Sequence, residues 1–138
     1  LALHGMKAIL IKHKPDIVAV DQLDKMQITG NHARDDIRLG EIYRTARGLS
    51  KKHSCALIGV SQANAEADGR TVLRFTQMAG SRVGKAAEAD LIIGIGKETE
   101  DMGEDNGLRH IYVSKNKLGG KHGTCSTVIQ PELSRYID

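Results

Sequence analysis

The sequence is poor in aromatic residues, which make up 3% of its 138 residues and include no tryptophan. The core is therefore expected to be aliphatic, built from Ile, Val, Leu and Ala. The same scarcity argues against base stacking as a way of binding nucleic acid, because stacking needs aromatic rings. Apolar residues at 40% and charged residues at 27% are ordinary proportions for one globular domain with a real core.

Cysteines and long apolar segments are also scarce. Cys55 and Cys125 have no Cys-x-x-Cys spacing, so we expect two reduced, buried thiols, and nothing supports a disulfide. No apolar run approaches the length of a membrane span, and residues 1–14 lack the cleavage region of a signal peptide. These absences predict a cytoplasmic protein without a membrane partner. The net charge of +3 is compatible with a nucleic-acid partner but does not demonstrate one.

The chain opens with a helix-like pattern followed by a strand-like run. Leu3, Met6 and Leu10 recur at helical spacing, and Pro15 is expected to end that helix. The run Ile17-Val-Ala-Val20, bounded by Asp16 and Asp21, is apolar throughout, whereas an exposed strand would alternate. It therefore predicts a fully buried strand of a parallel sheet.

Helix and strand patterns continue to alternate along the rest of the chain. Asp35 or Asp36 is expected to cap a second helix. Further predicted elements are strands at 55–61 and 91–95, a short helix within 80–88, and an antiparallel hairpin of 110–114 and 124–129. This order predicts an α/β fold in a single domain, 1–138, with a mainly parallel sheet flanked by helices and a C-terminal antiparallel hairpin.

Polar residues follow three of the predicted strands, where open α/β sheets bind ligands. Asp21 is suited to hold Mg²⁺ or its bound water, and the Gln62 amide is suited to sense a γ-phosphate or orient water. Lys115 and Lys117 form a basic pair at the end of the predicted strand 110–114. Each residue also has a plainer interpretation: a turn or cap for the aspartate, a loop for the glutamine, and a solvated edge strand for the lysines.

Taken together, these segments resemble a known family. They are Ile17-Val-Ala-Val-Asp21, Leu57-Ile-Gly-Val-Ser61-Gln62, Gly80-Ser81, Glu88-Ala89-Asp90 and Val113-Ser-Lys115-Asn-Lys117. In this order they resemble the RecA-like P-loop NTPase core of hexameric replicative helicases of the DnaB type, most of all those of bacteriophages. The likeness runs from about residue 15 to the end of the chain.

The resemblance implies a role for each of the strand-end residues. Asp21 matches the Walker B aspartate that acts on magnesium, and Gln62 matches the family's polar sensor. Lys115 and Lys117 match the basic pair that reaches a neighbouring subunit's nucleotide across the interface. The family usually has arginine at the second position, and Lys117 lacks the planar fork that makes bidentate phosphate contacts.

The resemblance also implies cofactors and partners. It implies Mg²⁺ with ATP or another NTP, single-stranded DNA, further copies of the chain in a ring, a primase domain or protein, and the cytoplasm of a bacterial or phage-infected cell. The loop Gly80-Ser-Arg82-Val-Gly-Lys85 matches the region that approaches DNA, so Arg82 and Lys85 are expected there. Lys25, His32 and Arg34 could track phosphates likewise.

The sequence lacks a complete phosphate loop, Gly-x-x-x-x-Gly-Lys-Ser/Thr. The segment 79–86 comes close, but Ala86 stands where a metal-binding hydroxyl is needed, and the segment follows the Asp21 strand instead of preceding it. We therefore expect a C-terminal portion of a helicase core, inactive alone, whose parent carries the phosphate loop upstream. A RecA/RadA-type recombinase and a non-catalytic RecA-derived module that binds DNA or a partner remain as alternatives.

Overall fold

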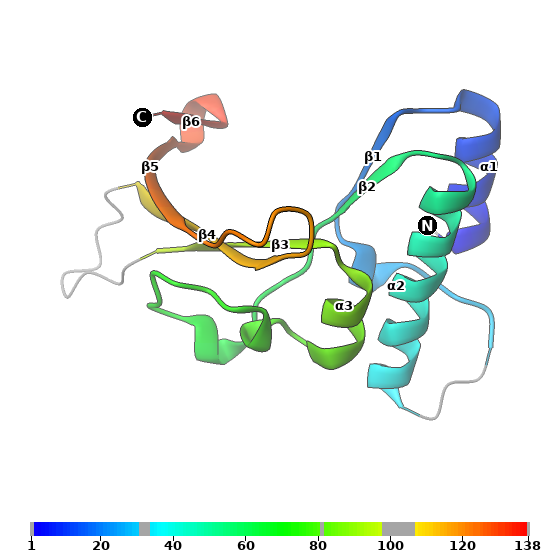
Figure 1. Cartoon of the computed structure of the whole chain (residues 1–138), viewed down its shortest axis with the longest axis horizontal. Helices are drawn as coiled ribbons and strands as arrows, with labels where there is room; N and C mark the ends of the chain where they lie inside the picture. The colour runs from blue at the N-terminus through cyan, green and yellow to red at the C-terminus, as the bar shows by residue number, and fades with distance from the viewer. Residues whose placement is uncertain (1, 31–33, 81, 98–106, 138) are drawn as a thin grey trace. The chain divides into compact units, whose positions relative to one another are not determined.

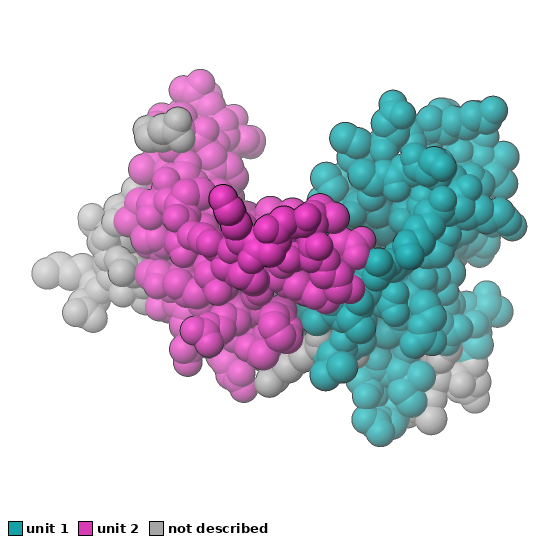
Figure 2. Space-filling model, in the orientation of Figure 1, with its two compact units in different colours: residues 1–62, 78–88 teal, residues 63–77, 89–138 magenta. Residues whose placement is uncertain are grey.

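The computed structural model describes residues 2–30, 34–80, 82–97 and 107–137. The chain divides into two compact units, each discontinuous in sequence. Unit 1 comprises residues 1–62 and 78–88, and unit 2 comprises residues 63–77 and 89–138 (Figure 2). No helix in the described ranges has the length and apolar character needed to cross a membrane.

Unit 1 begins with two helix–strand pairs (Figure 1). Helix α1 (Leu3–His13) ends just before Pro15, as the sequence predicted. Its C-cap residue, Lys14, takes the left-handed conformation (φ 46°). Strand β1 (Ile17–Val20), helix α2 (Asp35–Lys52) and strand β2 (Ala56–Gly59) follow. The two strands pair in parallel, and their register aligns the last residue of β1 with the last residue of β2.

The core of unit 1 lies between the helices and one face of this sheet. Its members are aliphatic or methionine, as expected: Leu3, Met6, Leu10, Leu23, Met26, Leu39, Ile42 and Ala46. Val18, Val20 and Leu57 of the strands pack against it. The opposite face is open, since Ile17 is 63% exposed and Ile58 is 55% exposed. The prediction of fully buried strands is therefore wrong for this chain, because the helices of unit 1 cover only one face.

Helices α2 and α3 (Arg82–Glu88) lie close together in unit 1. The N-cap of α2 is Arg34, without a side-chain cap bond, so the predicted capping by an aspartate is wrong. The two aspartates instead occupy the first turn, where carboxylates favour the helix dipole. Gly40 of α2 faces Gly84 of α3, and a Cβ added at Gly40 would lie 3.9 Å from the Gly84 Cα, an ordinary van der Waals distance. Arg47 then donates a 2.7 Å hydrogen bond to the Glu88 carbonyl.

Unit 2 is an antiparallel sheet in the order β3 (Leu91–Gly96), β4 (Leu108–Asn116), β5 (Thr124–Gln130) and β6 (Arg135–Ile137). The predicted hairpin is confirmed as β4–β5, and β6 was not predicted. β3 pairs with β4 in antiparallel orientation. The α/β class is confirmed, with its parallel pairing confined to β1–β2 in the described chain.

Short 3₁₀ helices and one closely packed glycine complete the architecture. The 3₁₀ segments are η1 (Leu23–Lys25), η2 (Ala65–Ala67), η3 (Phe75–Gln77) and η4 (Pro131–Leu133). A Cβ added at Gly94 would lie 2.4 Å from the Leu73 carbonyl oxygen, so glycine is what lets the loop before η3 approach β3. Both cysteines are free thiols, but Cys125 is exposed, so its predicted burial is wrong.

Candidate functional site

The carboxyl ends of β1 and β2 bring the predicted strand-end residues to one edge of the sheet. Asp21 follows β1 directly, and Gln62 lies three positions beyond β2. Backbone hydrogen bonds continue the pairing past the strands: Val60 donates to the Val20 carbonyl at 3.0 Å, and Leu23 donates to the Val60 carbonyl at 3.1 Å. Asp21 and Gln62 are both exposed at this edge.

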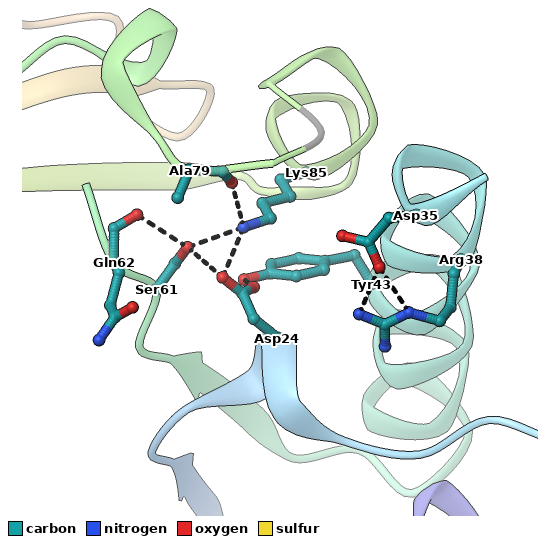
Figure 3. Close-up of polar contacts among 8 residues, drawn as sticks. All are labelled: Asp24, Asp35, Arg38, Tyr43, Ser61, Gln62, Ala79 and Lys85. Atoms are coloured by element: carbon teal, nitrogen blue, oxygen red, sulfur yellow. Dashed lines mark hydrogen bonds and ion pairs between the residues drawn. The ribbon is translucent and has the colours of Figure 1, made fainter. Parts of the chain in front are cut away.

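A second carboxylate at the same edge is already engaged. Asp24, in η1, accepts a 2.6 Å hydrogen bond from the Tyr43 hydroxyl on one oxygen. Its other oxygen accepts hydrogen bonds from Ser61 Oγ at 2.9 Å and from Lys85 Nζ at 2.6 Å. We call these four residues the Asp24 cluster; they come from η1, α2, the end of β2 and α3 (Figure 3).

Lys85 is the buried cation of the Asp24 cluster. Its side chain is 1% exposed, and its ammonium donates to Asp24, to Ser61 Oγ at 3.0 Å and to the Ala79 carbonyl at 2.6 Å. Those contacts use all of the donors that an ammonium has. A buried charge is tolerated only when it is paired and hydrogen-bonded in this way. The ammonium also lies 5.6 Å from the centre of the Tyr43 ring, within range of a cation–π contact.

Burial raises the pKa of the Tyr43 hydroxyl well above its usual range, and its hydrogen bond to Asp24 and the charge of that carboxylate add to the effect. The hydroxyl therefore stays protonated and donates to Asp24. This donor fixes one side of the carboxylate while Lys85 and Ser61 fix the other.

The structure corrects one predicted DNA contact. Lys85 was expected to face DNA, but its ammonium is buried and bonded inside the Asp24 cluster. Sequence reasoning also missed Asp24 and Tyr43 altogether. Both residues are partners of Lys85, and the sequence does not indicate that Lys85 is buried, because a lysine in a polar, glycine-containing segment is ordinarily exposed.

These contacts decide which carboxylate is suited to a metal. Both oxygens of Asp24 are occupied within the protein, whereas Asp21 presents an exposed carboxylate directly after β1. Carboxylate oxygens are the ligands that Mg²⁺ prefers, often with water completing its shell. The Gln62 amide, which points away from the cluster in Figure 3, adds a donor and an acceptor at the same edge. Asp21 and Gln62 thus present an exposed carboxylate and an exposed amide at this edge of the sheet.

Other residues predicted to approach DNA lie in unit 1. Lys25 is exposed at the end of η1. Arg34 is exposed and forms a bidentate pair with Asp36, at 3.0 and 2.7 Å. Arg82 begins α3, but its side chain, His32 and Ser81 lie outside the described residues.

The predicted basic pair belongs to unit 2. Lys115 is half-buried on β4 opposite Ile92, and Lys117 is exposed just after the strand. The Lys117 backbone N–H donates to the Asp90 carbonyl at 2.8 Å. Asn116 shapes the turn that follows, because its side-chain oxygen accepts from the N–H groups of Leu118 and Gly119 at 3.0 Å each.

Solved structures share this architecture. A structure of the ATPase domain of G40P superposes with a TM-score of 0.81 at 16% identity, covering 99% of this chain and 51% of that one. A DnaB-like replicative helicase, solved for its interactions with primase, gives 0.79 at 16% identity, covering 99% and 35%. The chain has a RecA-like ATPase fold. The predicted likeness to DnaB-type helicase cores is thereby confirmed for the fold.

The same fold extends to a recombinase. The RadB recombinase superposes with a TM-score of 0.57 at 16% identity, covering 93% of this chain and 56% of that one. This chain spans 51% of the G40P ATPase-domain structure and 35% of the DnaB-like replicative helicase structure. No protein-family profile and no curated protein sequence matches it.

Proposed function

We propose that this chain is the C-terminal part of the ATPase core of a DnaB-type replicative DNA helicase. In this proposal the complete protein hydrolyses ATP or another NTP between subunits of a ring and moves along single-stranded DNA, with a primase as a further partner. One observation carries the proposal: the exposed Asp21 and Gln62 end adjacent parallel strands in a chain that superposes over 99% of its length on helicase ATPase domains.

The residues at the sheet edge have distinct roles in this proposal. Asp21 holds Mg²⁺, directly or through a bound water, and the metal neutralises charge that develops on the phosphates. Gln62 orients the attacking water or contacts the terminal phosphate. Lys115 and Lys117 supply positive charge to the nucleotide of the neighbouring subunit, and Lys117 does so as a point charge where a fork would bind two oxygens.

The open face of the β1–β2 sheet supports the proposal that the core has a further part. Strands that are apolar on both faces are normally covered on both faces, yet Ile17, Ile58 and Val60 are 45–63% exposed. We propose that a preceding segment covers this face and carries the phosphate loop. The 138-residue chain alone is then expected to show no ATP turnover, and a turnover assay on it tests this point.

The decisive experiment replaces Asp21 in the protein encoded by the complete reading frame. We expect Asp21→Ala to lower DNA-stimulated ATP turnover by about a hundredfold or more, while nucleotide affinity changes by less than about tenfold. Asp16→Ala is the matched control, because Asp16 is also an exposed aspartate but precedes the same strand. Normal turnover in Asp21→Ala would refute the assignment of the metal-holding carboxylate.

Two alternatives are separated by simple measurements. A RadA-type recombinase would exchange strands without processive unwinding, and the higher TM-scores to helicase ATPase domains, 0.81 and 0.79 against 0.57, favour unwinding. A non-catalytic module would have no phosphate loop anywhere in its reading frame. Strand-displacement and strand-exchange assays on the complete protein, together with that reading frame, distinguish all three.

A further inference from the structure

Lys85 contacts two residues next to Gln62: Ser61, which precedes it in the chain, and Ala79, which bonds to its carbonyl. On one side, Ser61 Oγ accepts a 3.0 Å hydrogen bond from Lys85 and donates a 2.9 Å bond to Asp24. On the other side, the Gln62 carbonyl accepts the Ala79 N–H at 2.9 Å, and the Ala79 carbonyl accepts Lys85 Nζ at 2.6 Å. The buried Lys85 ammonium thus connects the Ser61 hydroxyl to Ala79, the residue whose N–H binds the Gln62 carbonyl (Figure 3).

Gly80 and the C-terminal end of α3 both lie close to α2. Gly80 has φ +72°, and a Cβ there would lie 2.4 Å from Leu39 Cδ1. Arg47 binds the Glu88 carbonyl at 2.7 Å at the C-terminal end of α3. Gln62 is thus linked to α3 through Ala79 and Lys85.

We propose that Lys85 is a positioning residue that couples Gln62 to Ala79 and to helix α3. This inference rests on the proposed function, in which Gln62 contacts the nucleotide and Arg82 lies near DNA. When Gln62 moves with the nucleotide, the Ala79 N–H and the Lys85 ammonium carry the movement to the beginning of α3. Lys85 then increases the stimulation of ATP turnover by DNA, and it does so by positioning Gln62.

The test is a double-mutant cycle in the protein encoded by the complete reading frame. The readout is the ratio of ATP turnover with and without a single-stranded oligothymidine, for wild type, Lys85→Met, Gln62→Ala and the double variant. We expect Lys85→Met and Gln62→Ala each to lower the ratio by about tenfold. The double variant should lower it no further than Gln62→Ala alone, because both changes break the same path.

Specific outcomes would overturn the inference. Lys85→Met with the wild-type ratio, or a double variant whose loss is the product of the two single losses, would show that Lys85 does not act through Gln62. Lys52→Met is the matched control, since Lys52 is an exposed lysine at the end of α2, and it should keep the wild-type ratio. A wild-type protein without any ATP turnover would refute the proposed function itself, and this inference with it.

A second variant guards against loss of folding, because removing Lys85 leaves the Asp24 carboxylate partly buried without its cation. The pair Lys85→Met with Asp24→Asn removes both charges and keeps an oxygen that accepts from Tyr43. Thermal unfolding shows which variants are folded. A folded pair that retains full DNA stimulation would overturn the coupling as clearly as the single variant.

Discussion

The two compact units bury their side chains to different extents. In unit 1, Met6, Leu10 and Ile42 are at most 1% exposed. Among the described residues of unit 2, one hydrophobic residue is buried: Ala67, which is 9% exposed. Unit 1 therefore has a packed apolar core, whereas the described part of unit 2 is an antiparallel sheet with little fully buried apolar surface.

This difference bears on how the site residues are positioned. Asp21 and Gln62 stand on strands whose inner face packs against α1 and α2, and the Asp24 cluster adds buried polar contacts at the same edge. Lys115 and Lys117 stand on a sheet whose β3 residues Ile93 and Ile95 are 51% and 48% exposed. Residues proposed to act within the subunit are thus fixed by its own core, and those proposed to act on a neighbour belong to the less buried unit.

Truncating one isoleucine in each unit tests this contrast most strongly. Ile42→Ala is expected to lower the free energy of unfolding by about 2–5 kcal/mol, because Ile42 is 0% exposed and its loss leaves a cavity. Ile93→Ala is expected to lower it by less than about 1 kcal/mol. Urea denaturation followed by circular dichroism measures both. If the two variants lose equal unfolding free energy, and the loss in Ile93→Ala grows with protein concentration, self-association buries Ile93 in solution.

Mixing subunits tests whether the two units serve different nucleotides. Asp21→Ala and Lys117→Ala are each expected to lower turnover of the complete protein by about a hundredfold, or about 2.7 kcal/mol. A random equal mixture should recover about a quarter of wild-type turnover, because that fraction of interfaces pairs an intact Asp21 with an intact Lys117. If the mixture stays as inactive as its parts, Lys117 acts within its own subunit or has no role. Lys117→Arg is the conservative variant and should remain active.

Two glycines with positive φ compare crowded and open backbone. Gly80→Ala in unit 1 is expected to destabilise the chain by about 1–3 kcal/mol, since the new Cβ would also lie 2.4 Å from Leu39 Cδ1. Gly120→Ala in unit 2 has a similar φ, +69°, but no atom within 4 Å of the new Cβ. It should cost only the strain of the left-handed backbone, about 1 kcal/mol. Equal losses in thermal stability would show that Leu39 moves aside freely.

The sequence was sufficient for features set by local pattern. The spacing of Leu3, Met6 and Leu10 predicted α1 because helical periodicity is written into neighbouring residues. The apolar runs predicted β1 and β2 and placed Asp21 and Gln62 at the same sheet edge. Their predicted complete burial was wrong because burial depends on what covers each face.

Long-range polar contacts were beyond sequence reasoning. Asp24 and Lys85 are 61 positions apart, and their pairing depends on α3 lying against α2. Nothing in a glycine-flanked lysine distinguishes a buried ammonium from a solvated one. The pairing of β3 with β4 was missed for a related reason, because a short apolar run does not reveal whether its partner is parallel or antiparallel.

The smallest expected effect concerns DNA, and it compares two edges of unit 1. Lys25 is exposed beyond the carboxyl end of β1, whereas Lys52 is exposed at the end of α2, ahead of β2. If Lys25 contacts a phosphate, Lys25→Ala should weaken single-strand binding by the complete protein and reduce the slope of log affinity against log salt by about 0.7. Lys52→Ala should leave that slope unchanged. Because each phosphate contact on a single strand releases about 0.7 of a counterion, the slope separates a direct contact from a general loss of positive charge. Identical slopes for both variants would place the DNA elsewhere.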